Sequence, residues 1–546
     1  MSDTFYGENN PFDPVPEPGN DPGPAAESDD TEGKNSAARQ DSQTARLLAL
    51  AEERFTLIKD TVGDVYGVDR DRPGIALPLD GKNGVAGELR RLYYDETNRA
   101  APATAIADTL SNLDAKGTRC ETPTPIYLRF GQTAGGKRVI DLGTDDGAAI
   151  VLDSSGWQVA ASSPVFFRRN KATNPMPRPI SGGSLDRFRA LINTDDDGFR
   201  LLVAWMLVAL CDDVQSPILC LIGQQGSAKT SCLRSVIGVV APSGAPLTSP
   251  PRDEDSWSLT ANASPVIGID NLSTVPLWFS DVLARTVSGD AVIKRALYSN
   301  QDITITSYRR AVAITSISPE GLRADVADRL CTVELNVIPK SGRRLDRELA
   351  AEFREIHAET LGALLDLLVQ VERALETITP PTELPRLADA GLMLHALDYV
   401  TGWDTLGSFI ESQDNAAEDV LDADVFAAAL IAFARERGVW EGTASEVLRA
   451  ISPERPPRAW PRNAQAAGAR LQRLAPPLVQ AGVHVEQRER TMHGRGWRIT
   501  YTPQPGERLC EVCRQPLHES LPDSITVHAT CAESVEEHTN ESEPLL

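Results

Sequence analysis

The amino-acid sequence predicts an α/β protein whose centre is a parallel β-sheet. Three observations predict this class. Between residues 196 and 340, short apolar segments typical of buried strands alternate with helical segments, as in a parallel sheet. One of these strands runs directly into a glycine-rich loop and then a helix. A second apolar strand, forty residues further on, ends in an acidic residue, Asp270.

Composition limits the surroundings and partners of the chain. A net charge of −23 argues against non-specific binding of nucleic acid by the whole chain, so any DNA-binding surface must be local. The N-terminus has neither the basic start nor the apolar stretch of a secretion signal. The longest apolar run, Leu201 to Cys211, is about half a membrane span and predicts a buried helix. We therefore expect a cytoplasmic protein without a membrane segment. Five scattered cysteines are expected to be reduced core thiols: Cys120, Cys211, Cys220, Cys232 and Cys331.

The first part of the chain is predicted to contain two regions. Residues 1–44 are predicted to be disordered and acidic, because residues 1–40 hold nine acids, two basic residues and six prolines. Residues 45–195 are predicted to form a mixed α/β domain, with a helix from about Ala45 to Lys59 and short strands from Ile126 to Phe167. The acidic sequence at residues 145–147 predicts a hairpin turn in preference to an acidic site.

The second part is predicted to contain the core and four further regions. In residues 196–340 the segments "PILCLIG", "PVIGID", "DITIT" and "AVAITSI" are predicted strands of the parallel sheet. Residues 341–439 are predicted to be helical and to be divided by the pair Pro380-Pro381. A winged-helix-like domain over 440–507, a zinc-binding module over 508–531 and an acidic tail over 532–546 follow.

The glycine-rich loop matches a phosphate-binding P-loop. The string "GQQGSAKT" fits the pattern G-x-x-x-x-G-K-[ST], except that Ala228 replaces the final glycine, where alanine fits if its φ is negative. Glycines let the backbone N–H groups wrap around phosphates, and the following helix adds the positive end of its dipole. Lys229 would meet the β- and γ-phosphates, and Thr230 would coordinate Mg²⁺. The predicted nucleotide-binding residues are Gly223, Gly226, Ser227, Ala228, Lys229, Thr230 and Ser231.

Polar residues at the ends of two later strands extend this site. Asp270 ends the strand "PVIGID", where ATPases with a P-loop need an acid to help hold the metal. Asn271 follows, in a place where many of them have a glutamate, so either Asn271 positions the attacking water or another acid such as Asp281 serves. Thr315 and Ser316 end the strand "AVAITSI" and either sense the γ-phosphate or cap the strand.

Two arginines come after the last of these strands. The string "GLRADVADRL" offers Arg323 and Arg329. An arginine that reaches the γ-phosphate of a neighbouring subunit would stabilise charge in the transition state. An ordinary salt bridge on a helix face is the alternative, and the sequence leaves both open.

The region from 440 to 508 has the opposite charge to the rest of the chain. Its eleven arginines outnumber its six acids. The strings "WEGTASEVLRAI" and "WPRNAQAAGARLQRLAPPLVQAG" predict two helices and "VHVEQRERTMHGRGWRITY" predicts a basic hairpin, an order typical of a winged helix. Such a domain could bind DNA, with a helix in the major groove and wing arginines on phosphates. The alternative is a basic domain that docks on the acidic remainder of the chain. The candidate DNA contacts are Arg462, Arg470, Arg473, Arg488, Arg490 and Arg495.

A cysteine and histidine cluster follows the basic region. Cys510 and Cys513 form one close pair, and His528 and Cys531 form another, a spacing that suits a tetrahedral structural Zn²⁺. His518 is a substitute ligand with a less typical spacing. The alternative is three reduced thiols in a flexible tail.

Taken in order, the motifs resemble a known family. The succession "GQQGSAKTS", "GIDNLS", "WFSDVLARTVSGD", "KRALYSNQD" and "RADVADRL", within residues 125–500, resembles ATP-binding proteins of phages and bacterial mobile elements. These proteins are related to the helicase half of primase-helicases, the superfamily-three type within the AAA+ group. The resemblance implies that Lys229 and Thr230 bind ATP and Mg²⁺, that Asp270 is the strand-end acid, and that Arg329 faces the adjoining subunit of a homo-oligomer such as a ring.

The expected function is a DNA-dependent ATPase, a helicase-type motor in the replication of a phage or mobile element, with ATP, Mg²⁺ and Zn²⁺ as cofactors. A DNA-binding regulator or adaptor that ATP switches without unwinding is the second hypothesis. A P-loop kinase for a small molecule is the third, and the basic domain argues against it. Because the chain has no primase zinc motif and no convincing polymerase carboxylates, primer synthesis is not expected.

Overall fold

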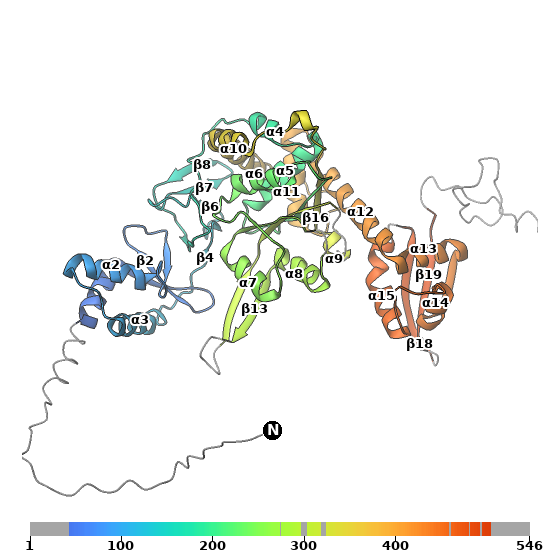
Figure 1. Ribbon diagram of the computed structural model, residues 1–546, viewed down its shortest axis with the longest axis horizontal. Helices are drawn as coiled ribbons and strands as arrows, with labels where there is room; N and C mark the ends of the chain where they lie inside the picture. The colour runs from blue at the N-terminus through green and yellow to red at the C-terminus, as the bar shows by residue number, and fades with distance from the viewer. Residues whose placement is uncertain are drawn as a thin grey trace, which may run out of the picture.

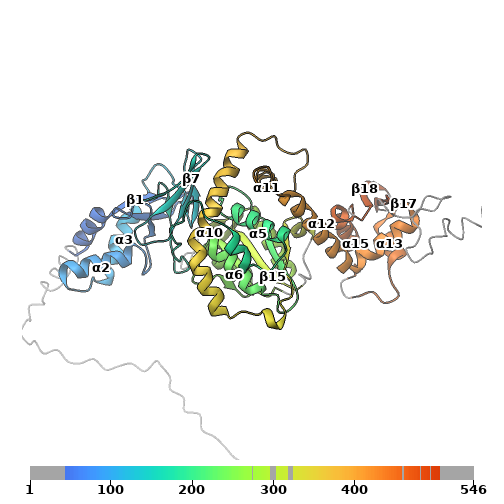
Figure 2. The same ribbon diagram turned by 90° about the horizontal axis from the view of Figure 1, so that it is seen from above.

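The chain folds into three units that follow one another along its longest dimension (Figures 1 and 2). The computed structural model describes residues 43–272, 275–295, 303–317, 324–457, 460–479, 481–491 and 494–503. The predicted disordered segment up to residue 42, the predicted zinc module and the acidic tail lie outside these described residues.

The first unit combines helices with a small antiparallel sheet. A helix over residues 43–54 is followed by β1 (Phe55–Lys59), β2 (Val65–Asp69) and β3 (Ala76–Pro78), and then by α2 (Val85–Thr97) and α3 (Ala103–Gly117). The predicted helix to Lys59 is wrong in its last five residues. These residues pair with β2 as a strand, because the aromatic and β-branched side chains of "FTLI" favour extended backbone.

A second sheet connects this unit to the centre. The strands β5 (Phe130–Gln132), β6 (Arg138–Asp141), β7 (Ala149–Asp153) and β8 (Gly156–Ala160) form an antiparallel meander, and β4 (Ile126–Tyr127) pairs with β9 (Phe166–Phe167). The prediction of a turn at residues 145–147 is confirmed, because these residues connect β6 to β7 and Gly147 has a φ of 73°. Arg138 on β6 bonds Glu372 of α10 (Asp346–Leu375) at 2.6 Å and also contacts Asp213, which fixes the meander to the central unit.

The central unit contains the predicted parallel sheet. Its five strands are β10 (Ile218–Ile222), β11 (Leu247–Thr248), β12 (Val266–Ile269), β15 (Ala311–Ser316) and β16 (Leu330–Glu334), all parallel, in the order β11-β12-β15-β10-β16. The glycine-rich loop therefore leaves a central strand. Because β15 lies between β10 and β12, the end of β15 is next to the ends of both.

One predicted strand of the parallel sheet belongs elsewhere. The segment "DITIT" is part of β14 (Ile303–Tyr308), which pairs antiparallel with β13 (Asp290–Arg295). This hairpin extends away from the core below α7 (Glu254–Ala263) and α8 (Leu277–Ser288) (Figure 1). Its sequence alternates apolar and polar residues, whereas "AVAITS" of β15 is buried along its whole length, as a central parallel strand requires.

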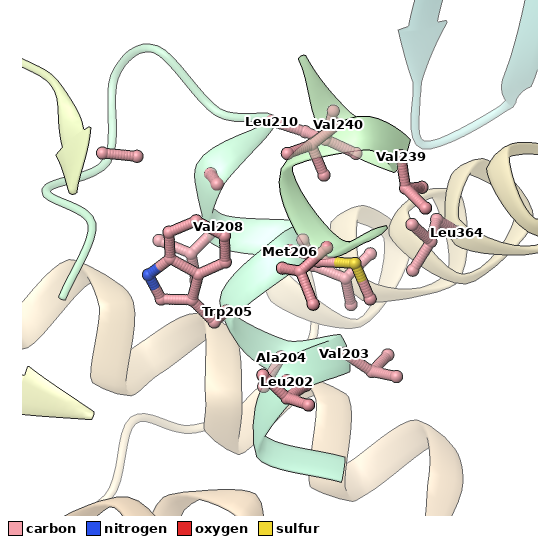
Figure 3. Close-up of a cluster of buried hydrophobic side chains, with 14 of the residues drawn as sticks. Leu202, Val203, Ala204, Trp205, Met206, Val208, Leu210, Val239, Val240 and Leu364 are labelled. Atoms are coloured by element: carbon pink, nitrogen blue, oxygen red, sulfur yellow. The ribbon is translucent and has the colours of Figure 1, made fainter. Parts of the chain in front are cut away.

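Helices cover both faces of the parallel sheet. They are α4 (Asp186–Leu191), α5 (Asp196–Ala209), α6 (Lys229–Val240), α7 (Glu254–Ala263), α8 (Leu277–Ser288) and α9 (Ala324–Ala327). The predicted buried helix at Leu201–Cys211 is confirmed, because it lies mainly in α5 and all of its residues are buried. Trp205 and Met206 of α5 lie in the cluster that also contains Val239, Val240 and Leu364 (Figure 3). The indole of Trp205 also donates to Pro217 O at 2.8 Å, directly before β10.

Long helices follow the sheet, as predicted. After a 3-10 turn at Lys340–Gly342 come α10 (Asp346–Leu375), α11 (Ala388–Thr401) and α12 (Thr405–Ala423). Pro380 and Pro381 lie between α10 and α11, which confirms that they divide this region. Phe409, near the start of α12, belongs to the central core, whereas Leu421, near its end, belongs to the core of the C-terminal unit.

The C-terminal unit is a three-stranded antiparallel sheet packed against helices. Its elements are α13 (Val425–Arg437), β17 (Val439–Thr443), α14 (Ala444–Ile451), α15 (Ala464–Leu478), β18 (Val483–Thr491) and β19 (Gly494–Tyr501). The predicted second helix and the hairpin are confirmed as α15 and β18–β19. The predicted helix "WEGTASEVLRAI" begins later than expected. Thr443 and Glu446 form a capping box that starts α14, and the residues before it form β17.

The described cysteines are free thiols, as predicted, but Cys120 is only half-buried and is not a core residue. Cys211, Cys220, Cys232 and Cys331 are buried, and burial raises the pKa of each to about 12. At neutral pH these thiols are protonated and behave as small apolar core residues. None of the described helices has the length and apolar character needed to span a membrane.

Candidate functional site

The loop between β10 and α6 is built to let another group approach its backbone. Gly223 has a φ of 151° and Gly226 a φ of 90°, which are backbone conformations that residues other than glycine rarely adopt. A Cβ atom on Gly223 would lie 2.7 Å from Leu335 O and 2.8 Å from the Ser227 hydroxyl. Ser227 is buried, and its hydroxyl donates to Gln224 O at 2.9 Å across the loop. These contacts hold the loop in one shape and require glycine at position 223.

Ala228 differs from the sequence expectation. Its φ is +62°, so the expected negative value is wrong. The left-handed conformation costs an alanine about 1–2 kcal/mol. Ala228 is the N-cap of α6, and its carbonyl accepts from Cys232 N–H at 2.9 Å. An N-cap residue ordinarily has extended backbone, so the positive φ comes from the tight turn of the loop and not from the helix. The loop therefore keeps its shape at a cost in stability, which a glycine at position 228 would avoid.

Lys229, the first residue of α6, folds back over the loop. Its ammonium donates to Gly223 O at 2.6 Å and to Gln224 O at 3.0 Å. Partial burial lowers the pKa of Lys229 from its ordinary value, and the negative charge of Asp270 opposes that shift. The ammonium thus lies at the mouth of the loop, held by two carbonyl groups that an anion could replace. Ser231, two residues further on, is half-buried in the first turn.

Three polar side chains meet beside this helix. The hydroxyl of Thr230 donates to the carboxylate of Asp270, at 3.0 Å from Oδ1 and 3.1 Å from Oδ2. The hydroxyl of Thr315, near the end of β15, donates to the same Oδ1 at 2.6 Å. The three residues come from α6, from the end of β12 and from β15. They meet at the carboxyl edge of the sheet because β15 lies between β12 and β10, the strand that leads into α6.

Asn271 is held next to this cluster by its backbone. Its N–H donates to the Thr315 hydroxyl at 2.8 Å, its φ is +59°, and its side chain is exposed. Asparagine tolerates this left-handed conformation better than most residues. Asp281 lies in the second turn of α8 and is also exposed. Ser316 is 1% exposed, and within the described part of the chain its hydroxyl has no hydrogen-bond partner.

Sequence reasoning missed a second layer that supports the loop. Asn193 donates to Ser227 O at 3.3 Å and also to Asn336 O. Leu335 N–H donates to Ile222 O at 2.9 Å, and Ile338 N–H donates to Gly226 O at 3.3 Å. The segment after β16 therefore runs beside the loop. No local pattern signals this contact, because its partners are more than a hundred residues apart in the sequence.

Arg329 lies away from the cluster. It precedes β16, and its carbonyl accepts a 2.8 Å bond from the N–H of Ile218, the first residue of β10. Arg329 is thus at the amino edge of the sheet, one strand length of roughly 16 Å from the loop. It is 8% exposed. Arg323 lies outside the described residues.

The six arginines named as DNA contacts lie in different surroundings. Arg462, Arg473 and Arg488 are exposed, and the side chains of Arg490 and Arg495 lie outside the described part of the chain. Arg470 is held internally: its guanidinium bonds Asp424 at 2.8 Å and lies over the ring of Phe426, 5.7 Å from its centroid. Asp424 is also the N-cap of α13, so Arg470 joins α15 to that helix.

The predicted zinc ligands Cys510, Cys513, His528 and Cys531 lie outside the described residues, as does His518. Within the described part of the chain, no group of three or more histidine, cysteine and acidic residues could hold a metal.

Two family models match consecutive segments of the chain. Residues 185–419 match the model described as "Actinomycete integrative conjugative element replication protein". Residues 426–515 match the model described as "AICE RepA C-terminal domain". Over both segments the chain matches mobile-element replication proteins. The first segment contains the loop, Asp270 and Thr315. The second contains the C-terminal unit and ends inside the predicted zinc module. The predicted link to a mobile element is thereby supported.

Comparison with solved structures gives weaker likenesses. The A form apo structure of the NrS-1 C-terminal region has 10% sequence identity and a TM-score of 0.36, and the match covers 83% of this chain and 98% of that one. A second apo structure of the same region has 10% identity, a TM-score of 0.35 and coverages of 84% and 99%. At these TM-scores the likeness carries no conclusion about this chain. A search of curated proteins finds no significant match.

Proposed function

We propose that this mobile-element replication protein is a DNA-dependent ATPase that works as a helicase-type motor. The observation that carries the proposal is the meeting of Thr230, Asp270 and Thr315 beside a glycine-built loop at the start of a helix. Hydroxyl and carboxylate oxygens next to a phosphate cradle are the groups that nucleotide hydrolysis with Mg²⁺ requires.

The loop fits the phosphates of a nucleotide. The backbone at Gly223 is closed to any Cβ, so its peptide groups can approach a ligand without an intervening side chain. The loop leads into α6, a 12-residue helix whose free N–H groups favour an anion. In this proposal Lys229 exchanges its bonds to the carbonyls of Gly223 and Gln224 for bonds to the phosphates.

The oxygen cluster fits Mg²⁺, which prefers hydroxyl and carboxylate oxygens. Thr230 and Asp270 would hold the ion. When bound, the ion would neutralise part of the charge on the phosphate oxygens. Thr315 keeps Asp270 oriented through its 2.6 Å bond. We assign Asn271 to orienting the attacking water, because its backbone is fixed by Thr315 and its side chain is exposed beside the cluster.

The C-terminal unit supplies a surface suited to DNA. On α15 the exposed residues Gln465, Ala469, Gln472 and Arg473 fall on one face, and the residues of the opposite face, including Leu471 and Leu474, are buried in the core. Glutamine and arginine carry the donors and acceptors that read base edges in a major groove. Arg488, exposed on β18, would contact phosphates beside that groove.

Arg329 is proposed to complete the site of an adjoining subunit. It lies at the edge of the sheet opposite its own loop, so it cannot reach a nucleotide bound there. If it acts between subunits, Lys229→Ala and Arg329→Ala proteins are each inactive alone, and mixed oligomers regain part of the activity. Mixed oligomers that remain inactive would leave Arg329 with a structural role.

Steady-state ATP hydrolysis with and without single- and double-stranded DNA tests the proposal. We expect hydrolysis that DNA stimulates, and loss of hydrolysis in Lys229→Ala with the fold retained. DNA binding with no effect of DNA on turnover would favour the alternative, an ATP-switched regulator. A Lys229→Ala protein that hydrolyses ATP at the parental rate would refute the assignment of the loop.

The zinc module stays a proposal from the sequence. Cys510, Cys513, His528 and Cys531 are proposed to hold one Zn²⁺ per chain. Elemental analysis of untagged protein tests this, with Cys510→Ser as the comparison. A parent protein with no zinc and a stable C-terminal region would refute it.

A further inference from the structure

The segment that follows β16 brings a second cation to the candidate phosphate loop. Its backbone bonds, from Leu335 N–H to Ile222 O and from Ile338 N–H to Gly226 O, hold it beside the loop. The 3-10 turn at Lys340–Gly342 then turns the chain back, with Gly342 N–H donating to Pro339 O at 2.9 Å. Arg343 is the next residue.

The guanidinium of Arg343 lies over the loop. A Cβ atom on Gly226 would be 3.1 Å from Arg343 Nη2, which makes this guanidinium the nearest group to that side of the glycine. The side chain is exposed, and among the described residues it has no hydrogen bond or ion pair. The adjacent Arg344 differs, because it bonds Glu352 at 2.5 Å. A planar cation without an anion partner thus stands beside a loop suited to phosphates.

We propose that Arg343 binds the phosphate chain of the nucleotide in its own subunit. This inference rests on the proposed function, since it assigns another residue to the same site. A guanidinium forms charge-assisted, often paired hydrogen bonds with phosphate oxygens, which a lysine ammonium cannot reproduce in geometry. Arg343 and Lys229 would approach the phosphates from different elements, the turn after β16 and the start of α6. Nucleotide binding would then also fix the segment after β16 against the loop.

Titration calorimetry with Mg-ATP tests the inference on the full-length chain. Arg343→Ala is expected to bind Mg-ATP at least about tenfold more weakly than the parent, the effect of one lost charge-assisted contact. Arg343→Lys, which keeps the charge, is expected to fall between the two. Arg344→Ala is the matched control and is expected to bind like the parent, because its partner is Glu352. Thermal unfolding of each variant checks that the fold is intact.

The outcomes separate this inference from the proposed function. A parent protein that does not bind Mg-ATP would overturn the proposed function and this inference with it. Parental binding together with undiminished binding by Arg343→Ala would overturn the inference alone, as would equal losses in Arg343→Ala and Arg344→Ala. Mixing supplies a second readout. A residue that acts within its own subunit is not rescued when Arg343→Ala is mixed with Lys229→Ala, so recovered hydrolysis would also contradict the inference.

Discussion

Thr315 donates a 2.6 Å hydrogen bond to the carboxylate of Asp270 and accepts a 2.8 Å bond from the N–H of Asn271. One hydroxyl thus fixes both residues that follow the apolar part of β12. Because the two residues lie at the end of a different strand from Thr315, their positions relative to Thr230 depend on how β15 and β12 pair in the sheet.

The first prediction concerns this hydroxyl. Thr315→Val keeps the shape of the side chain but removes the donor to Asp270, and a hydrogen bond to a charged group contributes about 1.5–3 kcal/mol. We expect ATP turnover to fall by about tenfold or more, while Thr315→Ser keeps most of the activity. Steady-state hydrolysis measures both variants. Parental turnover in Thr315→Val would show that Asp270 needs no support from β15.

The second prediction concerns the strain at Ala228. Glycine adopts a φ of +62° without the clash that alanine suffers, although it makes the unfolded chain more flexible. We expect Ala228→Gly to raise the free energy of unfolding by roughly 1 kcal/mol, seen as a higher melting temperature. Ala350→Gly, at an exposed position inside α10, is the control and should destabilise the protein by a similar amount. A lower melting temperature for Ala228→Gly would mean that the loop relaxes in solution.

The third prediction separates two arginines of α15. Arg473 is exposed, so Arg473→Ala is expected to weaken DNA binding and to reduce its dependence on salt by about one phosphate contact. Arg470 is engaged with Asp424 and Phe426, so Arg470→Ala is expected to lower the stability of the C-terminal unit and leave the salt dependence unchanged. Binding isotherms over a salt series decide this. A reduced salt slope in Arg470→Ala would place that guanidinium on DNA.

The fourth prediction concerns pH. His357 on α10 is buried against α6, with Nε2 3.4 Å from Val239 O, and burial lowers its pKa to about 4. Because an unfolded histidine has a pKa of about 6.5, the unfolded chain binds more protons between these values. The contribution of His357 to stability is therefore full above pH 6.5 and falls as the pH drops towards 4, by roughly 3 kcal/mol at pH 4.

Chemical denaturation at a series of pH values measures this loss. The variant His357→Gln cannot titrate, so its stability should fall less steeply than that of the parent between pH 6.5 and 4. Identical slopes for the two proteins would mean that His357 is solvated when it becomes protonated.

Much of the central unit could be predicted from the sequence, because its strands are continuous apolar runs and its loop has a fixed spacing. The sequence also pointed to Asp270 and Thr315 separately. Their hydrogen bond could not be predicted, because it depends on β15 lying between β10 and β12, and strand order is set by tertiary packing. The short strands β11 and β16 were missed, since neither "LT" nor "LCTVE" has a periodic signal.

The remaining differences have local physical causes. The segment at 303–308 is not part of the parallel sheet, because its sequence alternates apolar and polar residues, whereas a parallel sheet covered on both faces favours continuous apolar strands. Arg343 and Asn193 reach the loop through backbone contacts between distant segments, which no spacing rule reports. Ala228 adopts a positive φ because the turn of the loop into α6 requires it, although an alanine at an N-cap ordinarily has extended backbone. A sequence pattern cannot show which of these two conflicting preferences prevails.

The helix α12 limits how this protein can be divided. Its first half is anchored in the central unit by Phe409, and by Gln413, which bonds Asp328 O at 2.5 Å, while Leu421 lies in the C-terminal core. The two matched family segments meet between residues 419 and 426, at the end of this helix. If mobile elements exchange C-terminal units by recombination, a junction at residue 424 would leave Leu421 against a foreign core. A functional hybrid would have to acquire the second half of α12 together with the C-terminal unit.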